Sequence, residues 1–142
     1  MITDAQNRPT QLSQSLVGSG TIVSTDSIDL QTANRNVGRA FGMRMVAFLQ
    51  TALVGATSVQ VQIITSASGA LTSPTVIATG PVVLLAAALA GTRILDLPIP
   101  GTTQRYLGLQ FVLVGTATAG TVQGDVVAES DNQPYLVMNT GL

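Results

Sequence analysis

Aliphatic and amide side chains alternate along two stretches of this chain of 142 residues. In residues 58–65 (SVQVQIIT), valine and isoleucine alternate with glutamine, and in residues 105–115 (RYLGLQFVLVG) Leu and Phe occupy every second position. Successive side chains of a β-strand point to opposite faces, so a period of two places one kind of side chain on each face. Both stretches are predicted to be strands, the second of them central.

The same period and closely spaced turn signals extend over most of the chain. Glycine and proline separate the periodic stretches at Gly55-Ala56, Ser68-Gly69, Gly80-Pro81, residues 98–101 and residues 115–120. Such spacing is typical of a sandwich or barrel. The further predicted strands are residues 21–24, 27–31, 43–52, 74–78, 82–87, 93–97 and 121–128.

Together these patterns predict an all-β fold in a single domain. Eight or nine strands fit a jelly-roll-like β-sandwich. We expect an N-terminal arm at residues 1–20, the sandwich at residues 21–130 and a C-terminal tail at residues 131–142, because both ends are polar or lack alternation.

The composition predicts an unusually neutral surface. Only 9% of the residues are charged, the net charge is −1, and all six cations are arginine. A soluble domain usually has about 25% charged residues. Since copies of such a chain repel one another weakly, the composition suits a subunit of an assembly and argues against nucleic-acid binding.

Neither a membrane span nor a secretory signal is expected. The longest apolar run, residues 82–90 (VVLLAAALA), is too short to cross a bilayer as a helix, and the first residues have no basic start followed by an apolar run. We therefore expect synthesis in a cytoplasm and no membrane partner.

Catalysis and metal binding are not expected. Histidine and cysteine are absent, which removes the commonest general base and the strongest nucleophile. Two acidic sets are candidate calcium ligands, Asp26 with Asp29, and Asp125 with Glu129 and Asp131, but neither matches a calcium-binding loop. We predict no cofactor, with Asp26 as a turn residue and Asp29 as a surface charge or arginine partner.

Half of the arginines lie in one short segment, residues 34–44 (NRNVGRAFGMR). Arginine suits interfaces because its planar group pairs with carboxylates through two hydrogen bonds, and Phe41 can anchor beside it. The alternative is a solvated loop. Nucleic acid is a weaker third possibility, because three arginines are too few to follow a groove.

A glycan-binding β-sandwich is the main competing class. Such modules present aromatic faces to sugar rings, and this chain has no tryptophan and only five other aromatic residues. A tail or fibre component of a virion is a further alternative.

Several runs resemble, in order along most of the chain, the capsid cement or decoration proteins of tailed phages, of the jelly-roll type known from a Bordetella phage. The runs are MITD (1–4), QLS (11–13), VSTDSIDL (23–30), SPTVIA (73–78), AGTR (90–93), LP (97–98), GT (101–102), RYL (105–107) and AGTV (119–122). Two departures are Gly108, where a larger side chain is expected, and the long tail.

The resemblance implies a jelly roll on the outer surface of the virion that bridges major capsid proteins without catalysis. It also implies self-association, as a two-fold dimer or, second, a trimer. Many weak neutral contacts repeated over a shell add up through avidity, so the composition agrees. The predicted contacts with capsid or sister subunits are Met1, Ile2, Arg8, Leu12, Leu16, Arg35, Arg39, Phe41, Arg44, Tyr135, Leu136, Val137 and Met138.

Overall fold

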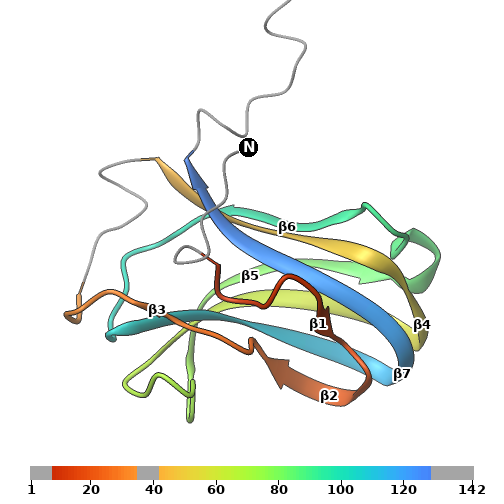
Figure 1. Ribbon diagram of the computed structural model, residues 1–142, viewed down its shortest axis with the longest axis horizontal. Coiled ribbons are helices and arrows are strands. Elements are labelled where there is room, and N and C mark those ends of the chain that lie inside the picture. Colours follow the sequence, from red (N-terminus) through yellow and green to blue (C-terminus); the bar gives the residue numbers. More distant parts are fainter. Residues whose placement is uncertain (1–7, 35–41, 129–142) are drawn as a thin grey trace, which may run out of the picture.

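The computed structural model describes residues 8–34 and 42–128 as one antiparallel sheet folded over on itself (Figure 1). This described part contains seven strands. They are β1 (Gln14–Ser15), β2 (Gly18–Val23), β3 (Ile28–Asp29), β4 (Met43–Ser66), β5 (Thr75–Leu84), β6 (Arg93–Pro98) and β7 (Tyr106–Ala128). A short 3-10 turn, Leu85–Ala87, follows β5. No helix in the described part is long and apolar enough to cross a membrane.

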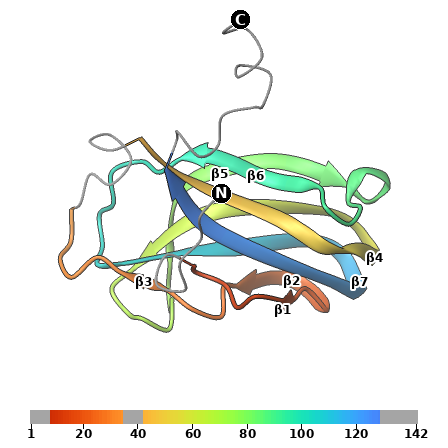
Figure 2. The same ribbon diagram turned by 45° about the horizontal axis from the view of Figure 1, so that its top comes forward.

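Two long strands form the centre of the fold. β4 and β7 pair from Met43 opposite Ala128 to Ser66 opposite Tyr106. Figure 2 shows them side by side, with β5 and β6 beyond β4 and with β1 and β2 beyond β7. At about 3.3 Å per residue, strands of this length are too long to lie flat in a domain of this size, so they have to bend.

The bend divides the sheet into two layers. In one, β6 pairs with residues 44–48 of β4, and β1 pairs with residues 121–122 of β7. In the other, β5 pairs with residues 58–65 of β4, while β2 and β3 pair with the first half of β7. We call these the β1/β6 layer and the β2/β5 layer. The β1/β6 layer has four strands and the β2/β5 layer has five, because β2 and β3 share one edge of β7. This connectivity is that of a jelly roll, which confirms the predicted all-β sandwich.

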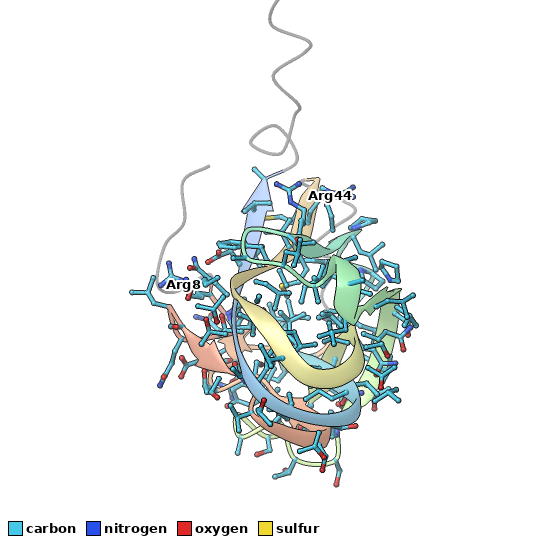
Figure 3. All side chains as sticks on the ribbon, turned by 90° about the vertical axis from the view of Figure 1, so that its right-hand side faces the viewer. Arg8 and Arg44 are labelled. Atoms are coloured by element: carbon cyan, nitrogen blue, oxygen red, sulfur yellow. The ribbon has the colours of Figure 1, made fainter. Side chains whose placement is uncertain are left out.

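Glycines in left-handed conformations make the bend possible. Gly55 has φ of 91°, and Gly115, which pairs with the next residue, Ala56, has φ of 85°. An added Cβ on Gly55 would lie 2.6 Å from the carbonyl oxygen of Thr116, so no larger residue fits there. The register of β4 against β7 shifts several times between Leu49 and Ser58. The end-on view in Figure 3 shows both strands curving around the packed interior.

This bend corrects the predicted strand ends. The glycines at residues 55 and 115–120 were expected to terminate strands, but pairing between β4 and β7 continues through them. Residues 43–52 and 58–65 therefore form one strand, as do residues 105–115 and 121–128, apart from Arg105. A glycine with positive φ can bulge a strand without ending it, and the sequence does not distinguish the two cases.

The core lies between the two layers. Alternation places aliphatic side chains inward on both sides of the bend, but along β7 the inward positions change from odd-numbered to even-numbered residues. In β7, Leu109 and Phe111 point inward before the bend, whereas Val122 and Val126 point inward after it. The extra residues of the bulges shift the phase by one, which keeps aliphatic side chains in the core of both layers.

The predicted N-terminal arm needs correction. Gln14 pairs with Val122, β2 continues from Gly18, and Leu16 is a fully buried core residue. Residues 8–20 are therefore part of the described fold and not a free arm. Burial of Leu16 places its side chain inside the sandwich, where it cannot contact a partner. Residues 1–7 and the tail from residue 129 lie outside the described part.

Candidate interaction surfaces

Four of the predicted contact residues fall within the described structure: Arg8, Leu12, Leu16 and Arg44. Leu16 belongs to the core, whereas Leu12 is exposed over 63% of its surface. The other predicted contacts lie outside the described residues. They are Met1, Ile2, Arg35, Arg39, Phe41, Tyr135, Leu136, Val137 and Met138.

Arg8 binds a fully buried carboxylate. Its Nε donates to Oδ1 of Asp125 at 2.9 Å, and the Asp125 side chain has no exposed surface. The amide of Gln123 donates to the other carboxylate oxygen at 2.8 Å, and Gln50 in turn donates to Gln123. Beside this pair, the backbone N–H of Gly124 donates to the hydroxyl of Thr10 at 2.7 Å. These bonds hold the segment before β1 against β7.

Arg44 belongs to a second ionic group in the same layer. Its Nε donates to Oδ1 of Asp96 at 2.7 Å, and Nη1 of Arg93 donates to Oδ2 of the same carboxylate at 2.9 Å. All three side chains are half-buried or exposed. One aspartate therefore joins the starts of β4 and β6.

The two ionic groups share the outer face of the β1/β6 layer. Val46 pairs with Asp96 on one side and with Asp125 on the other, and directly paired residues point to the same face. We call this surface, with Arg8, Arg44, Arg93, Asp96 and Asp125, the charged face. Figure 3 shows Arg44 at the start of β4 and Arg8 at the start of the described chain.

The charged face also lies where the described chain is interrupted. Met43 pairs with Ala128, so the chain that follows the gap at 35–41 begins beside the end at 128, whereas the chain before the gap ends after β3, in the other layer. Arg8, the first described residue, lies against Asp125 three positions before that end. Residues 1–7 and 129–142, together with the C-terminal end of the gap at 35–41, therefore adjoin this layer.

The outer face of the β2/β5 layer has a different character. Cross-strand pairing aligns Leu84, Ser58 and Val114 in one row. A second row contains Val82, Gln60, Val112 and Thr21, and a third contains Thr79, Gln62, Gln110 and Val23. The described strands that form these rows contain no charged residue in this region. We call the three rows the neutral face.

Aliphatic side chains are exposed on the neutral face. Leu84 is 61% exposed, and Val82 and Val114 are each 56% exposed. The sequence reasoning did not identify these residues as a surface. The signal was present in Val112 and Val114, which alternate with the core positions of β7.

Amide groups on the neutral face bond to one another across the strands. Gln110 donates to Gln62, and Gln62 donates to the hydroxyl of Thr79 at 3.5 Å. Gln60 donates to the backbone carbonyl of Gly80 at 3.0 Å. Since these amides already have protein partners, water can leave the face at lower cost than from unpaired amides.

A loop closes one end of the neutral face. Leu71, in the loop between β4 and β5, is buried against Gly108. A Cβ added to Gly108 would lie 2.5 Å from Cδ1 of Leu71. The hydroxyl of Ser24 lies 3.0 Å from the same point. Glycine at position 108, which departs from the expected pattern, therefore leaves room for the loop.

One further ion pair lies at the edge of the β2/β5 layer. Both carboxylate oxygens of Asp29 accept hydrogen bonds from Arg105 at 2.7 Å, and the backbone N–H of Gln31 also donates to Oδ1. The bonds from Arg105 and from the Gln31 N–H lower the pKa of Asp29 to about 2, and the bonds to Asp29 raise the pKa of Arg105. The prediction that Asp29 is an arginine partner is confirmed.

Among residues 8–34 and 42–128, no three acidic side chains gather as metal ligands. Asp125, one of the candidate calcium ligands, accepts a hydrogen bond from Arg8 at Oδ1 and one from Gln123 at Oδ2. Glu129 and Asp131 lie outside the described residues.

The fold and its two faces define a class: a single-domain jelly-roll sandwich with one charge-bearing and one uncharged outer face. The model of the Bbp16 family matches residues 12–126, which is most of the chain. The chain therefore belongs to the Bbp16 family. The family name points to a protein of a Bordetella phage, in agreement with the phage origin that the resemblance implies. No curated protein matches the chain.

Proposed function

We propose that this protein is a capsid cement, or decoration, protein of a phage head. It binds the outer surface of the major capsid protein shell, bridges neighbouring subunits and stabilises the head, without catalysis. The observation that carries the proposal is the Bbp16 match over residues 12–126, and the ordered runs that resemble cement proteins support it. Self-association, as a dimer or second as a trimer, is part of the proposal.

The side of the β1/β6 layer is the surface proposed to face the shell. Residues 1–7, residues 129–142 and the C-terminal end of the gap at 35–41 adjoin this layer, and Leu12 is exposed beside β1. Arg8 and Arg44 are already bonded to aspartates, so they contribute mainly by holding this surface in place. Ion pairs of this kind fix geometry more than they add net attraction.

A capsid reconstitution tests the proposal. Purified protein is added to matured phage capsids that lack it, and bound protein and retention of DNA on heating are measured. We expect binding and a higher temperature of DNA release. An absence of binding to capsids, or binding with no change in heat resistance, would contradict the cement role, and binding to tails or sugars instead would favour the alternatives.

Two variants locate the shell-binding surface. Deleting residues 1–7 leaves β1 and the core intact, and Leu12→Glu places a charge on an exposed leucine. Both are expected to weaken capsid binding at least tenfold, because each contact is repeated over the shell and losses multiply through avidity. Leu89→Glu is the matched control, since Leu89 is 58% exposed and follows the 3-10 turn after β5.

A further inference from the structure

Residues 8–16, which we call the strap, lie between β7 and β2 at one side of the sandwich (Figure 1). The bonds of Arg8 and Thr10 attach the strap to β7 in the β1/β6 layer. Between β2 and β3, in the other layer, the backbone N–H of Asp26 donates to the carbonyl of Pro9 at 2.9 Å. The strap therefore joins the edges of the two layers.

Gln14 is the residue of the strap that bonds to both layers by itself. Its backbone pairs with Val122 of β7. Its buried side-chain amide donates to the carbonyl of Val23 at 2.9 Å and accepts from the backbone N–H of Thr25 at 3.0 Å. A peptide group of a neighbouring parallel strand would bond to residues 23 and 25 in the same way, so this side chain closes the edge of β2.

The strap has few of the interactions that hold the central strands together. Of its nine residues, only Gln14 and Ser15 pair in a ladder, whereas β4 and β7 pair along nearly their whole length. Leu16 is its one large aliphatic side chain in the core. Segments with few ladder bonds and little buried apolar surface open at lower free energy than the core, often as one cooperative unit.

The outer side of the strap bears the proposed contacts with the shell. Leu12 lies on it and is 63% exposed, and residues 1–7 precede Arg8 directly in the sequence. These contacts keep their positions relative to the sandwich only while the strap is bonded to it. Shell binding therefore favours the closed strap, and a closed strap favours shell binding to the same degree.

We infer that the strap opens as one unit in the free protein and that binding to the shell holds it closed. Because the closed strap joins the edges of the two layers, the sandwich resists opening most strongly when it is attached to the shell. The first part of the inference concerns the free protein alone. The second part rests on the proposed function.

Hydrogen exchange of the free protein, measured by NMR, tests the first part. Four backbone N–H groups have their bonds to or from the strap: Leu16 to the carbonyl of Gly120, Thr25 to Gln14, Asp26 to Pro9, and Gly124 to Thr10. We expect these four groups to share one opening constant, and we expect the groups in the centre of the β4 and β7 ladder to open less often.

Gln14→Met removes both side-chain bonds and keeps a similar shape. It leaves a buried carbonyl and a buried N–H without a partner, so we expect the opening constant to rise at least tenfold. The decisive groups are Asp26 and Gly124, which Gln14 does not bond, because they respond only if the strap opens as a unit. If Gln14→Met does not fold, Thr10→Val serves instead, read at Thr25 and Asp26.

The matched control for Gln14→Met is Gln62→Met. Gln62 also bonds across strands through its side chain, but it lies on the neutral face, away from the strap. This variant should leave all four exchange rates unchanged. Unrelated opening constants among the four groups in the wild type, or a response to Gln14→Met confined to Thr25, would overturn the first part.

Exchange in the presence of matured capsids, measured by mass spectrometry, tests the second part. We expect bound protein to exchange the four strap groups at least fivefold more slowly than free protein, in the usual range of coupling between sites. Leu89→Glu should retain this slowing, and Leu12→Glu should reduce it along with binding. Binding that leaves the strap exchange unchanged would overturn the coupling while the cement role stands. Absence of binding would overturn the cement role and the coupling together, and the strap as a unit would still be decided by the free protein.

Discussion

The two outer faces of the sandwich differ although the same two strands contribute to both. Residues 44–48 of β4 contribute to the charged face, and residues 58–62 contribute to the neutral face. Of the described charged residues, five lie on the charged face (Arg8, Arg44, Arg93, Asp96 and Asp125), and none lies on the neutral face. The bend in β4 and β7 thus separates two surface chemistries within one continuous sheet.

The difference shows two ways in which a chain with little charge uses its polar groups. On the charged face, Asp125 is fully buried and its bonds hold the segment before β1 in place. On the neutral face, glutamines bond across strands and leave aliphatic groups exposed. The first arrangement contributes to the fold, and the second leaves an uncharged surface with exposed aliphatic groups.

The largest expected loss of stability follows from removing Arg8 from its pair with the buried Asp125. Arg8→Ala leaves the Asp125 carboxylate buried with the Gln123 amide as its remaining donor in the described structure. An uncompensated buried charge costs about 3 kcal/mol or more. We expect the free energy of unfolding to fall by about 3 kcal/mol, measured by urea denaturation.

The matched control for Arg8→Ala is Arg105→Ala, which removes an arginine from the exposed pair with Asp29. That variant should unfold at nearly the same urea concentration as the wild type, because exposed pairs are screened by water. Equal effects of the two substitutions would mean that the buried pair on the charged face does not hold the fold.

A smaller loss of stability is expected from a substitution at Gly108, at the end of the neutral face that the loop between β4 and β5 closes. In Gly108→Ala, the new methyl group would lie 2.5 Å from Cδ1 of Leu71 and 3.0 Å from the hydroxyl of Ser24. Overpacking of this kind costs about 1–3 kcal/mol. We expect a loss of stability in that range, because the loop has to shift.

A double-mutant cycle with Leu71→Ala checks the cause of this loss. Leu71→Ala removes the side chain that the new methyl group meets, so the double variant should be less destabilised than the sum of the two single variants. Additive losses would show that Leu71 is not the residue that requires glycine at position 108.

The sequence predicts the elements of this fold better than their continuity. Alternation in residues 58–65 and 105–115 correctly identified two strands and their inward faces. Gly55 and Gly115 were read as chain turns, because a positive φ supports a turn or a bulge equally well and the choice depends on the opposite strand. Leu16 was assigned to an arm, because its burial comes from pairing with a distant part of β7.

The candidate surfaces were predictable to a smaller extent. Arginine content singled out Arg44, but its partner Asp96 is 52 residues away and only the pairing of β4 with β6 brings the two together. The neutral face could be predicted only by placing β5, β4, β7 and β2 side by side in that order. Periodicity assigns side chains to a face of a strand, whereas the composition of a whole face depends on register and strand order.

The smallest expected effect is the acid titration of the exposed pair, which sharpens the contrast with the buried one. The pKa of Asp29 is lowered from 3.8 to about 2 by Arg105 and the Gln31 N–H. Since its folded pKa lies below the unfolded value, the pair stabilises the fold above pH 3.8, and this contribution is lost as the pH falls toward 2. Titration of the Asp29 carboxyl carbon by NMR should give a midpoint near 2, and Arg105→Gln should move it toward 3.8. Added salt should move the wild-type midpoint in the same direction, because both groups are exposed. A wild-type midpoint near 3.8 at low salt would show that this pair does not form in solution.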